Sequence, residues 1–266
     1  MVPLLNRRSD RANNYQPILS NREIDEYAHA VLKDYKPRLL REPGTIDYMH
    51  FLESYLGMEL LFYDIYNDDP DRPIVAMTAF KKGRIRIFDK ENECVKKVTV
   101  PARSVIFDNS ILADDKEHFA LFSGMHESGH ITMQWHVFAC ETFDGDPFDT
   151  DFDWNKSIKP IVCCRRSNIE SKATTKKNRT AEEWREYHAD YFAAAITMPN
   201  CTFLPFINNQ LHEYNYYKGF ITLGRDDDLD ILACDLLPEA ISEVYGVSKR
   251  AALIKLKTSG FVMGRV

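Results

Sequence analysis

The sequence predicts an α+β protein in which a small mixed sheet packs against helices. Residues 58–107 contain short β-prone segments separated by turn residues, whereas apolar residues recur at helical spacing in much of the rest of the chain. The composition is that of a folded protein, because 44% of the 266 residues are hydrophobic and 28% are charged. We therefore expect one large domain or two small ones, either of which can bury a hydrophobic core.

Composition and charge exclude several other classes of protein. No apolar run reaches the roughly 18 residues that a membrane span requires, and the first residues lack the apolar stretch of a secretory signal. We therefore expect a cytoplasmic protein with no membrane association, whose six cysteines are mostly reduced. The net charge of −6 gives no overall footprint for nucleic acid, so direct nucleic-acid binding is not expected.

Two helices are expected before the sheet. The first covers residues 23–35, where apolar side chains recur at helical spacing. The second runs from about Ile46 to Leu56, with Thr45 as its N-cap and Gly57 at its C-terminal end. We assign residues 1–57 to an N-terminal helical segment that packs on the rest of the protein.

Two further helices are expected after the sheet. One runs from about Asp115 to His136. The other begins at a T-x-x-E capping box formed by Thr180 and Glu183, and Pro199 stops it. These helices complete a catalytic core that we assign to residues 58–200.

Residues 141–179 separate these two helices and are divided by charge. Six acidic residues lie in 141–153 with no basic residue, whereas eight Lys or Arg residues stand against one acid in 156–179. This pattern is typical of a long loop or an insertion. If the acidic part is a lid, its charges would attract a basic substrate.

The remaining residues, 201–266, predict two or three helices that form the C-terminal part of the same domain. Gly246 and Gly260 stand where C-terminal caps are expected. Residues 243–256 resemble a helix-turn-helix in which Ser248 caps the second helix. Packing against the rest of the protein explains this segment better than DNA contact does. If the segment did contact DNA, four cationic side chains could bind the phosphates. They are Lys249, Arg250, Lys255 and Lys257.

The motif that carries chemistry is H-E-x-x-H at residues 126–130. Residues four apart share one face of a helix, so His126 and His130 can both reach one Zn²⁺ ion. Glu127 lies off that face and can act as the general base toward a water molecule. The alternative is a pair of surface histidines one turn apart.

A catalytic zinc site needs a third protein ligand, and the helix after Thr180 supplies candidates. Glu186 and Asp190 are four residues apart and share a face. Glu186 can bind zinc, while Asp190 can accept a hydrogen bond from the far nitrogen of a ligand histidine. His188 is rotated about 200° from Glu186 and is the weaker ligand candidate.

These segments resemble the ImmA/IrrE family of metallopeptidases. That family joins an H-E-x-G-H helix to a later helix of the form E-x-x-A-N-x-F-A-x-x-L-L-M-P, and this chain has His126-Glu-Ser-Gly-His130 and then Glu186-Tyr-His-Ala-Asp-Tyr-Phe-Ala-Ala-Ala-Ile-Thr-Met-Pro199. The tail from Tyr245 to Leu256 also resembles the family, so the likeness covers about 100–260. Asp190 replaces the usual Asn, and the gap of 55 residues between His130 and Glu186 is longer than expected.

The resemblance implies a zincin-like fold and a zinc-dependent endopeptidase with one Zn²⁺ per chain. By position, His126, His130 and Glu186 would be the metal ligands and Glu127 the catalytic acid and base. Known members cleave helix-turn-helix transcriptional repressors, so the expected partner is a protein substrate such as a DNA-binding repressor. Candidates for stabilising the transition state remain open. They are Tyr187, His188, Arg185 and His212.

Two other hypotheses for function remain beside the peptidase. The protein could be a metal-bound regulatory or binding module with a peptidase-like fold and no proteolysis, although Glu127 would then have no purpose. It could also be a DNA-binding regulator acting through residues 236–260. A second, structural zinc site is a separate and weaker possibility, because the usual knuckle spacing is absent. Its ligands would be His136, Cys140, Cys163 and Cys164.

Overall fold

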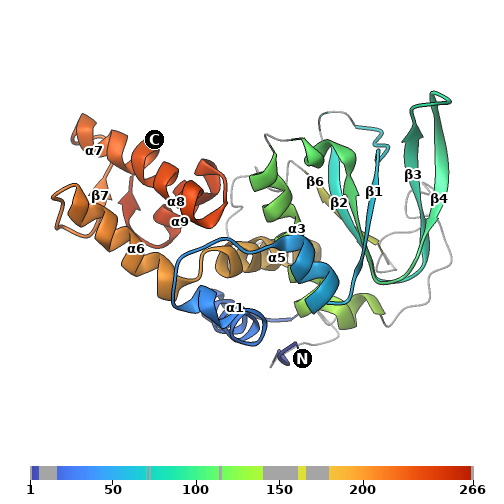
Figure 1. The fold of residues 1–266 in the computed structure, drawn as a ribbon, viewed down its shortest axis with the longest axis horizontal. Coiled ribbons are helices and arrows are strands. Elements are labelled where there is room, and N and C mark those ends of the chain that lie inside the picture. Colours follow the sequence, from blue (N-terminus) through green and yellow to red (C-terminus); the bar gives the residue numbers. More distant parts are fainter. Residues whose placement is uncertain are drawn as a thin grey trace.

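The computed structural model confirms a mixed α+β fold with a small sheet and several helices. It describes residues 2–5, 17–69, 71, 73–113, 116–139, 161–165 and 180–264, and for 161–165 it describes the backbone alone. The strands from β1 to β6 lie on one side of the molecule and the C-terminal helices on the other, with helices α3 and α5 between them (Figure 1). None of the described helices is both long and apolar enough to cross a bilayer.

The N-terminal part contains the two predicted helices with different boundaries. Helix α1 (Asn21–Tyr35) begins at a capping box formed by Ser20 and Glu23 and buries one apolar face. A 3₁₀ turn, η2 (Pro37–Leu40), follows. Helix α2 (Tyr48–His50) continues into the π-helical turn η3 (Phe51–Tyr55), and Gly57 after it has φ +67°.

The predicted cap of this second helix is wrong. Asp47 accepts the backbone N–H of His50 at 3.0 Å and is the true N-cap, so the helix begins later than Thr45 would require. The hydroxyl of Thr45 instead donates to the carbonyl of Val244 at 3.5 Å. Thr and Asp can both cap a helix. Here Thr45 contacts the C-terminal part of the protein, and Asp47 caps the helix.

The main sheet has four strands in the order β1-β5-β2-β6. Strand β1 (Glu59–Tyr63) runs parallel to β5 (Ser104–Asp108), while β2 (Ile74–Ala79) is antiparallel to β5 and to β6 (Ile161–Arg165). Strand β2 is therefore interior, and all six of its residues are buried. A separate antiparallel ribbon is formed by β3 (Gly83–Asp89) and β4 (Cys94–Val100).

The sheet is not confined to residues 58–107, because β6 comes from the segment predicted to be a charged insertion, 141–179. Strand β6 pairs with β2 from Ile161 to Arg165. The run Ile161-Val-Cys-Cys is β-prone, but the charges on both sides of it gave the segment the appearance of a loop. The rest of the insertion, including the predicted acidic lid, lies outside the described residues.

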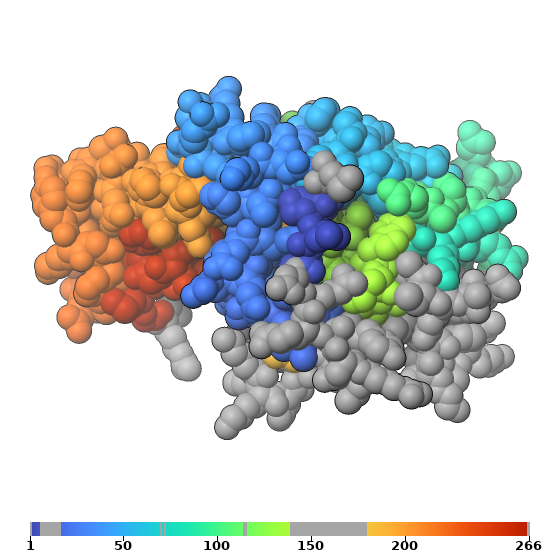
Figure 2. All heavy atoms as spheres, turned by 90° about the horizontal axis from the view of Figure 1, so that it is seen from below, coloured from blue at the N-terminus to red at the C-terminus, as the bar shows by residue number. Residues whose placement is uncertain are grey.

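Helices α3 and α5 form the centre of the molecule. A 3₁₀ turn, η4 (Asn109–Leu112), precedes α3 (Glu117–Ala139). Helix α5 (Ala181–Thr197) begins at the predicted capping box of Thr180 and Glu183 and ends just before Pro199. Helix α1 packs against α5 and lies at the centre of the face seen in Figure 2, between the C-terminal helices and the strands.

The C-terminal part contains three helical stretches, as predicted. They are α6 (Asn200–Glu213), the continuous run α7 (Asp227–Ile231), η6 (Leu232–Leu236) and α8 (Leu237–Tyr245), and α9 (Lys249–Thr258). Gly246 ends α8 with φ +70°, and Ser248 caps α9. Two short parallel strands, β7 (Ile221–Thr222) and β8 (Val262–Met263), were not predicted.

The contact between α3 and α5 predicts the effect of enlarging Gly129. A Cβ atom at this position would lie 2.9 Å from the Cα atom of Ala189, which is closer than real Cβ contacts allow. We expect Gly129→Ala to lower the free energy of unfolding by about 1–3 kcal/mol, although alanine favours helices. Chemical denaturation measures this, with Gly44→Ala as the control because its Cβ would meet only Leu39 at 3.5 Å. Equal stability of the Gly129→Ala variant and the unmodified protein would contradict the close contact.

Candidate metal centre

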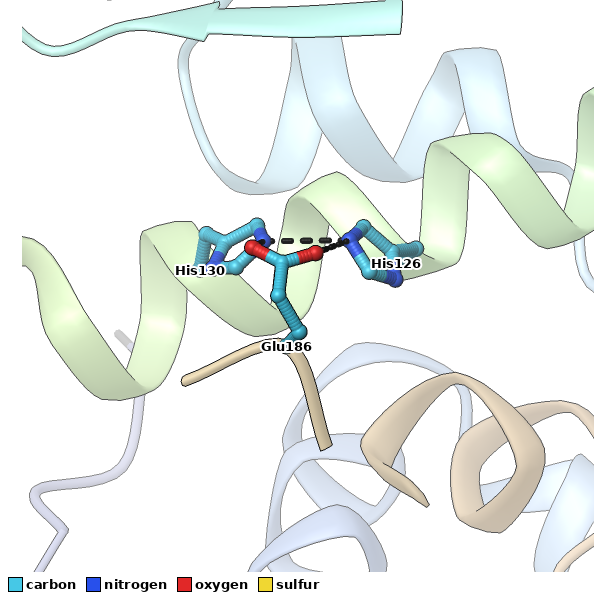
Figure 3. Close-up of side chains that lie close together, drawn as sticks. All are labelled: His126, His130 and Glu186. Atoms are coloured by element: carbon cyan, nitrogen blue, oxygen red, sulfur yellow. Dashed lines mark hydrogen bonds and ion pairs between the residues drawn. The ribbon is translucent and has the colours of Figure 1, made fainter. Parts of the chain in front are cut away.

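Three predicted ligand residues converge where α3 faces α5. His126 and His130 project from adjacent turns of α3, and Glu186 reaches between them from α5 (Figure 3). The two Nε2 atoms are 3.0 Å apart, and each lies 3.5 Å from one carboxylate oxygen of Glu186. Both histidines are fully buried, whereas the side chain of Glu186 is 21% exposed, so the cluster has access to solvent on the Glu186 side.

Each histidine is oriented by a second polar group. The Nδ1 atom of His126 lies 2.7 Å from Asp190 Oδ1, as the sequence predicted. The Nδ1 atom of His130 lies 2.7 Å from Gln134 Oε1, and the Gln134 amide donates to the carbonyl of Arg185 at 3.0 Å. Because that carbonyl can only accept, the Gln134 oxygen must accept the Nδ1 proton of His130.

This arrangement makes the Nε2 atoms of the two rings face the same point. The Nδ1 atoms of His126 and His130 lie against Asp190 and Gln134, so the two Nε2 atoms point toward each other across 3.0 Å. Burial lowers the pKa of His130 to about 4, which keeps that ring neutral at pH 7. Two ring nitrogens and a carboxylate that converge on one point can share a proton there or bind a metal ion.

The separations of the three residues fit such a cation. Ligand atoms about 2.0–2.1 Å from one tetrahedral ion stand about 3.3 Å apart, close to the 3.0 and 3.5 Å observed here. Two imidazoles and one carboxylate are a donor set that zinc binds with a fourth position open. The cluster can therefore hold a metal ion.

Glu127 is fully buried beside the cluster. Its Oε2 atom accepts a hydrogen bond from the hydroxyl of Thr78 in β2, whereas its Oε1 atom is buried with no hydrogen-bond partner among the described residues. Burial raises the pKa of Glu127 to about 7, against opposing contributions from His126 and Thr78. A carboxylate with one oxygen held by a hydrogen bond and the other left to accept can take up and return a proton.

Hydrogen bonds from α1 hold the helix that carries Glu186. The Tyr187 hydroxyl donates to Asn21 at 2.7 Å, and the Tyr191 hydroxyl donates to Asp25 at 3.0 Å. The Tyr187 hydroxyl is engaged by α1 in this structure, and its role in stabilising a transition state stays a prediction.

The other candidates for transition-state stabilisation have different surroundings. His188 is buried, with its ring 5.6 Å from that of Trp184. His212 lies in α6, where its ring is 5.0 Å from that of Tyr217. The guanidinium of Arg185 lies 5.7 Å from the ring centre of Phe138, and its Nη1 atom is buried with no hydrogen-bond partner in the described part of the chain.

Two weaker predictions involve other segments. The side chains of Cys140, Cys163 and Cys164, which would complete a second zinc site with His136, lie outside the described residues. In the segment that resembles a helix-turn-helix, Lys249 forms an ion pair with Glu239. Lys255 is only 6% exposed and lies over the ring of Phe203. These contacts favour packing over DNA contact for that segment.

Three residues of the site were not singled out from the sequence. Gln134 continues the i, i+4 series of His126 and His130, so helical spacing could have identified it. Gly129 stands inside the motif, where only a small residue admits Ala189. Thr78 belongs to a strand 49 positions away, and no local pattern connects it with Glu127.

Comparison with known families supports the resemblance found in the sequence. The model of the IrrE N-terminal-like domain (Peptidase_M78) matches residues 162–257, which include Glu186 and the helices from α5 to α9. The resemblance to the ImmA/IrrE metallopeptidases is thereby confirmed over these residues. The family is one of metal-dependent peptidases, so the match indicates a metallopeptidase-like protein. Helix α3 precedes the matched residues, and no curated protein matches the chain.

The hydrogen bonds of the histidines predict that Gln134 strengthens metal binding. Gln134→Ala removes the acceptor that orients His130, and we expect the affinity for Zn²⁺ to fall about 10- to 100-fold. Competition with a chromophoric chelator measures the affinity. Gln210→Ala in α6, which removes a surface contact with Glu213, is the matched control and should not change it. An unchanged affinity of Gln134→Ala would show that this hydrogen bond does not support the site.

The pKa of Glu127 predicts a pH-dependent stability of the metal-free protein. Because burial raises this pKa from 4.5 to about 7, the folded state binds the proton more tightly than the unfolded state does. The contribution of Glu127 to stability is therefore lost as the pH rises from about 4.5 to 7. Relative to Glu127→Gln, which cannot ionise, the unmodified protein should lose about 3 kcal/mol between pH 4.5 and 8. Denaturation in excess chelator measures the difference, and a pH-independent difference would contradict the prediction.

Proposed function

We propose that the protein is a zinc-dependent endopeptidase. The observation that carries the proposal is the convergence of His126, His130 and Glu186 beside a buried Glu127, whose Oε1 atom has no hydrogen-bond partner in the part of the chain that the structure describes. Zinc suits two imidazoles and a carboxylate, and a zincin-like fold would place the general base of an H-E-x-x-H motif next to the metal. The family match supports the same assignment.

The mechanism assigns a proton-transfer role to Glu127. When bound, Zn²⁺ would supply a Lewis acid that polarises the scissile carbonyl and makes a bound water more acidic. Glu127 takes the proton of the attacking water on Oε1 and returns it to the leaving amine. Asp190 and Gln134 keep the two imidazoles in the tautomer that a metal requires.

For the substrate we propose a regulatory protein, such as a helix-turn-helix transcriptional repressor. The support is the likeness to the ImmA/IrrE metallopeptidases, in which this is the known substrate class, together with the six acids in 141–153 that would attract a basic DNA-binding protein. A repressor encoded beside the gene is the first substrate to test, and fluorescent casein is a general one.

Two variants test the proposed function. The unmodified protein should bind one Zn²⁺ and hydrolyse the repressor or casein, while Glu127→Gln should bind the same zinc and lose activity about 10²- to 10⁴-fold. His130→Ala should lose zinc binding. Metal analysis, gel assays and release of fluorescent peptides provide the measurements.

The outcomes separate the peptidase from its alternative. Equal activity of Glu127→Gln and the unmodified protein would refute the mechanism. Stoichiometric zinc without hydrolysis of either substrate would favour a metal-bound regulatory module with no proteolysis.

A further inference from the structure

Thr78 is the only polar side chain of the interior strand β2, whose sequence is Ile-Val-Ala-Met-Thr-Ala. It is fully buried, and its hydroxyl donates to Oε2 of Glu127 in α3. A hydroxyl in a buried strand needs a partner, but a buried sheet would be equally well served by valine, which has the same shape and no such need. We therefore look for the reason for a threonine at position 78 in its contact with Glu127 of α3.

The backbone of Thr78 is held on both sides. It pairs with Val105 in β5 and with Val162 in β6, so the residue lies at the centre of three strands. Its β-branched side chain has few rotamers available there. The hydroxyl therefore reaches Glu127 from a rigid position in the sheet, whereas Glu127 itself has a flexible side chain on a helix.

The two oxygens of Glu127 consequently have different surroundings. Oε2 is held by Thr78, while Oε1 has no hydrogen-bond partner among the described residues although it is buried. A hydroxyl has one proton to donate, so it can fix one carboxylate oxygen and leave the other as the proton acceptor. Fixing Oε2 sets the rotation of the carboxylate and hence the direction of Oε1.

We propose that Thr78 is a positioning residue for the general base, which holds Glu127 so that Oε1 faces the water to be deprotonated. This inference rests on the proposed function. Thr78 is not a catalytic residue, since it acts only through Glu127. Its hydroxyl links the interior strand of the sheet to the H-E-x-x-H helix.

The test compares Thr78→Val, which removes the donor and keeps the shape, with Thr78→Ser, which keeps the donor. With zinc-loaded protein and casein, we expect Thr78→Val to lower kcat about 10- to 100-fold, with KM and bound zinc changed less than about twofold. Thr78→Ser should recover most of kcat. The matched control is Thr99→Val in the ribbon, at an exposed position of β4, which should not change kcat.

A second measurement does not depend on hydrolysis. In metal-free protein, Thr78→Val should lower Tm more when Glu127 is present than in a Glu127→Ala background, because the valine leaves a buried carboxylate without its donor. Equal Tm shifts in the two backgrounds would refute the contact. If Thr78→Val does not fold, Thr78→Ala and Thr78→Ser provide the same comparison.

The results distinguish this inference from the proposed function. An unchanged kcat with a lowered Tm would show that Thr78 is only structural and would overturn the inference, while loss of zinc from Thr78→Val would also overturn it. If zinc-loaded unmodified protein hydrolyses nothing, the proposed function fails and the positioning role fails with it. Unequal Tm shifts in that case would still establish the contact between Thr78 and Glu127.

Discussion

The close approach of α3 to α5 is the constraint on which the rest of the structure depends. Gly129 lies against the backbone of Ala189, at a distance that would not admit one further carbon atom. Since Gly129 directly precedes His130 and Ala189 directly precedes Asp190, the contact occurs within the metal cluster itself. If a methyl group at position 129 pushed α5 away from α3, both Glu186 and Asp190 would move away from the two histidines. The small size of Gly129 and Ala189 therefore allows Glu186 to approach the two histidines as a third potential ligand.

Burial of charge is the main energetic cost of this arrangement. His126, Glu127 and His130 are all fully buried within five residues of one helix, where ionised groups are stable only with partners. Asp190, Gln134 and Thr78 supply those partners from three different elements. The metal ion that we propose would be held by the two Nε2 atoms and the Glu186 carboxylate. The protein thus keeps three potential ligands together through contacts made by other buried groups.

The parts of this site that follow local rules could be predicted from the sequence. Helical spacing joined His126 with His130 and Glu186 with Asp190, and a capping box located the start of α5. Distant contacts had no such pattern. The local sequence predicts Thr45 as a cap although its hydroxyl is directed to Val244, and the two blocks of charge around β6 obscure its β-prone residues. Tyr187 was a candidate for catalysis by its position beside Glu186, but its contact with Asn21 depends on where α1 docks.

The anchors of the metal cluster are distributed between Asn21 and Tyr191, and this has a consequence for how the site forms. Glu186 reaches the histidines only when α5 is docked, and α5 is tied through Tyr187 and Tyr191 to α1, more than 160 positions earlier. Glu127 depends in the same way on β2, which is itself held between β5 and β6. No single segment contains a preformed site, so metal binding requires the folded state and in turn stabilises it. The ligand set is therefore a property of the tertiary fold more than of the H-E-x-x-H motif, which supplies only two of its three members.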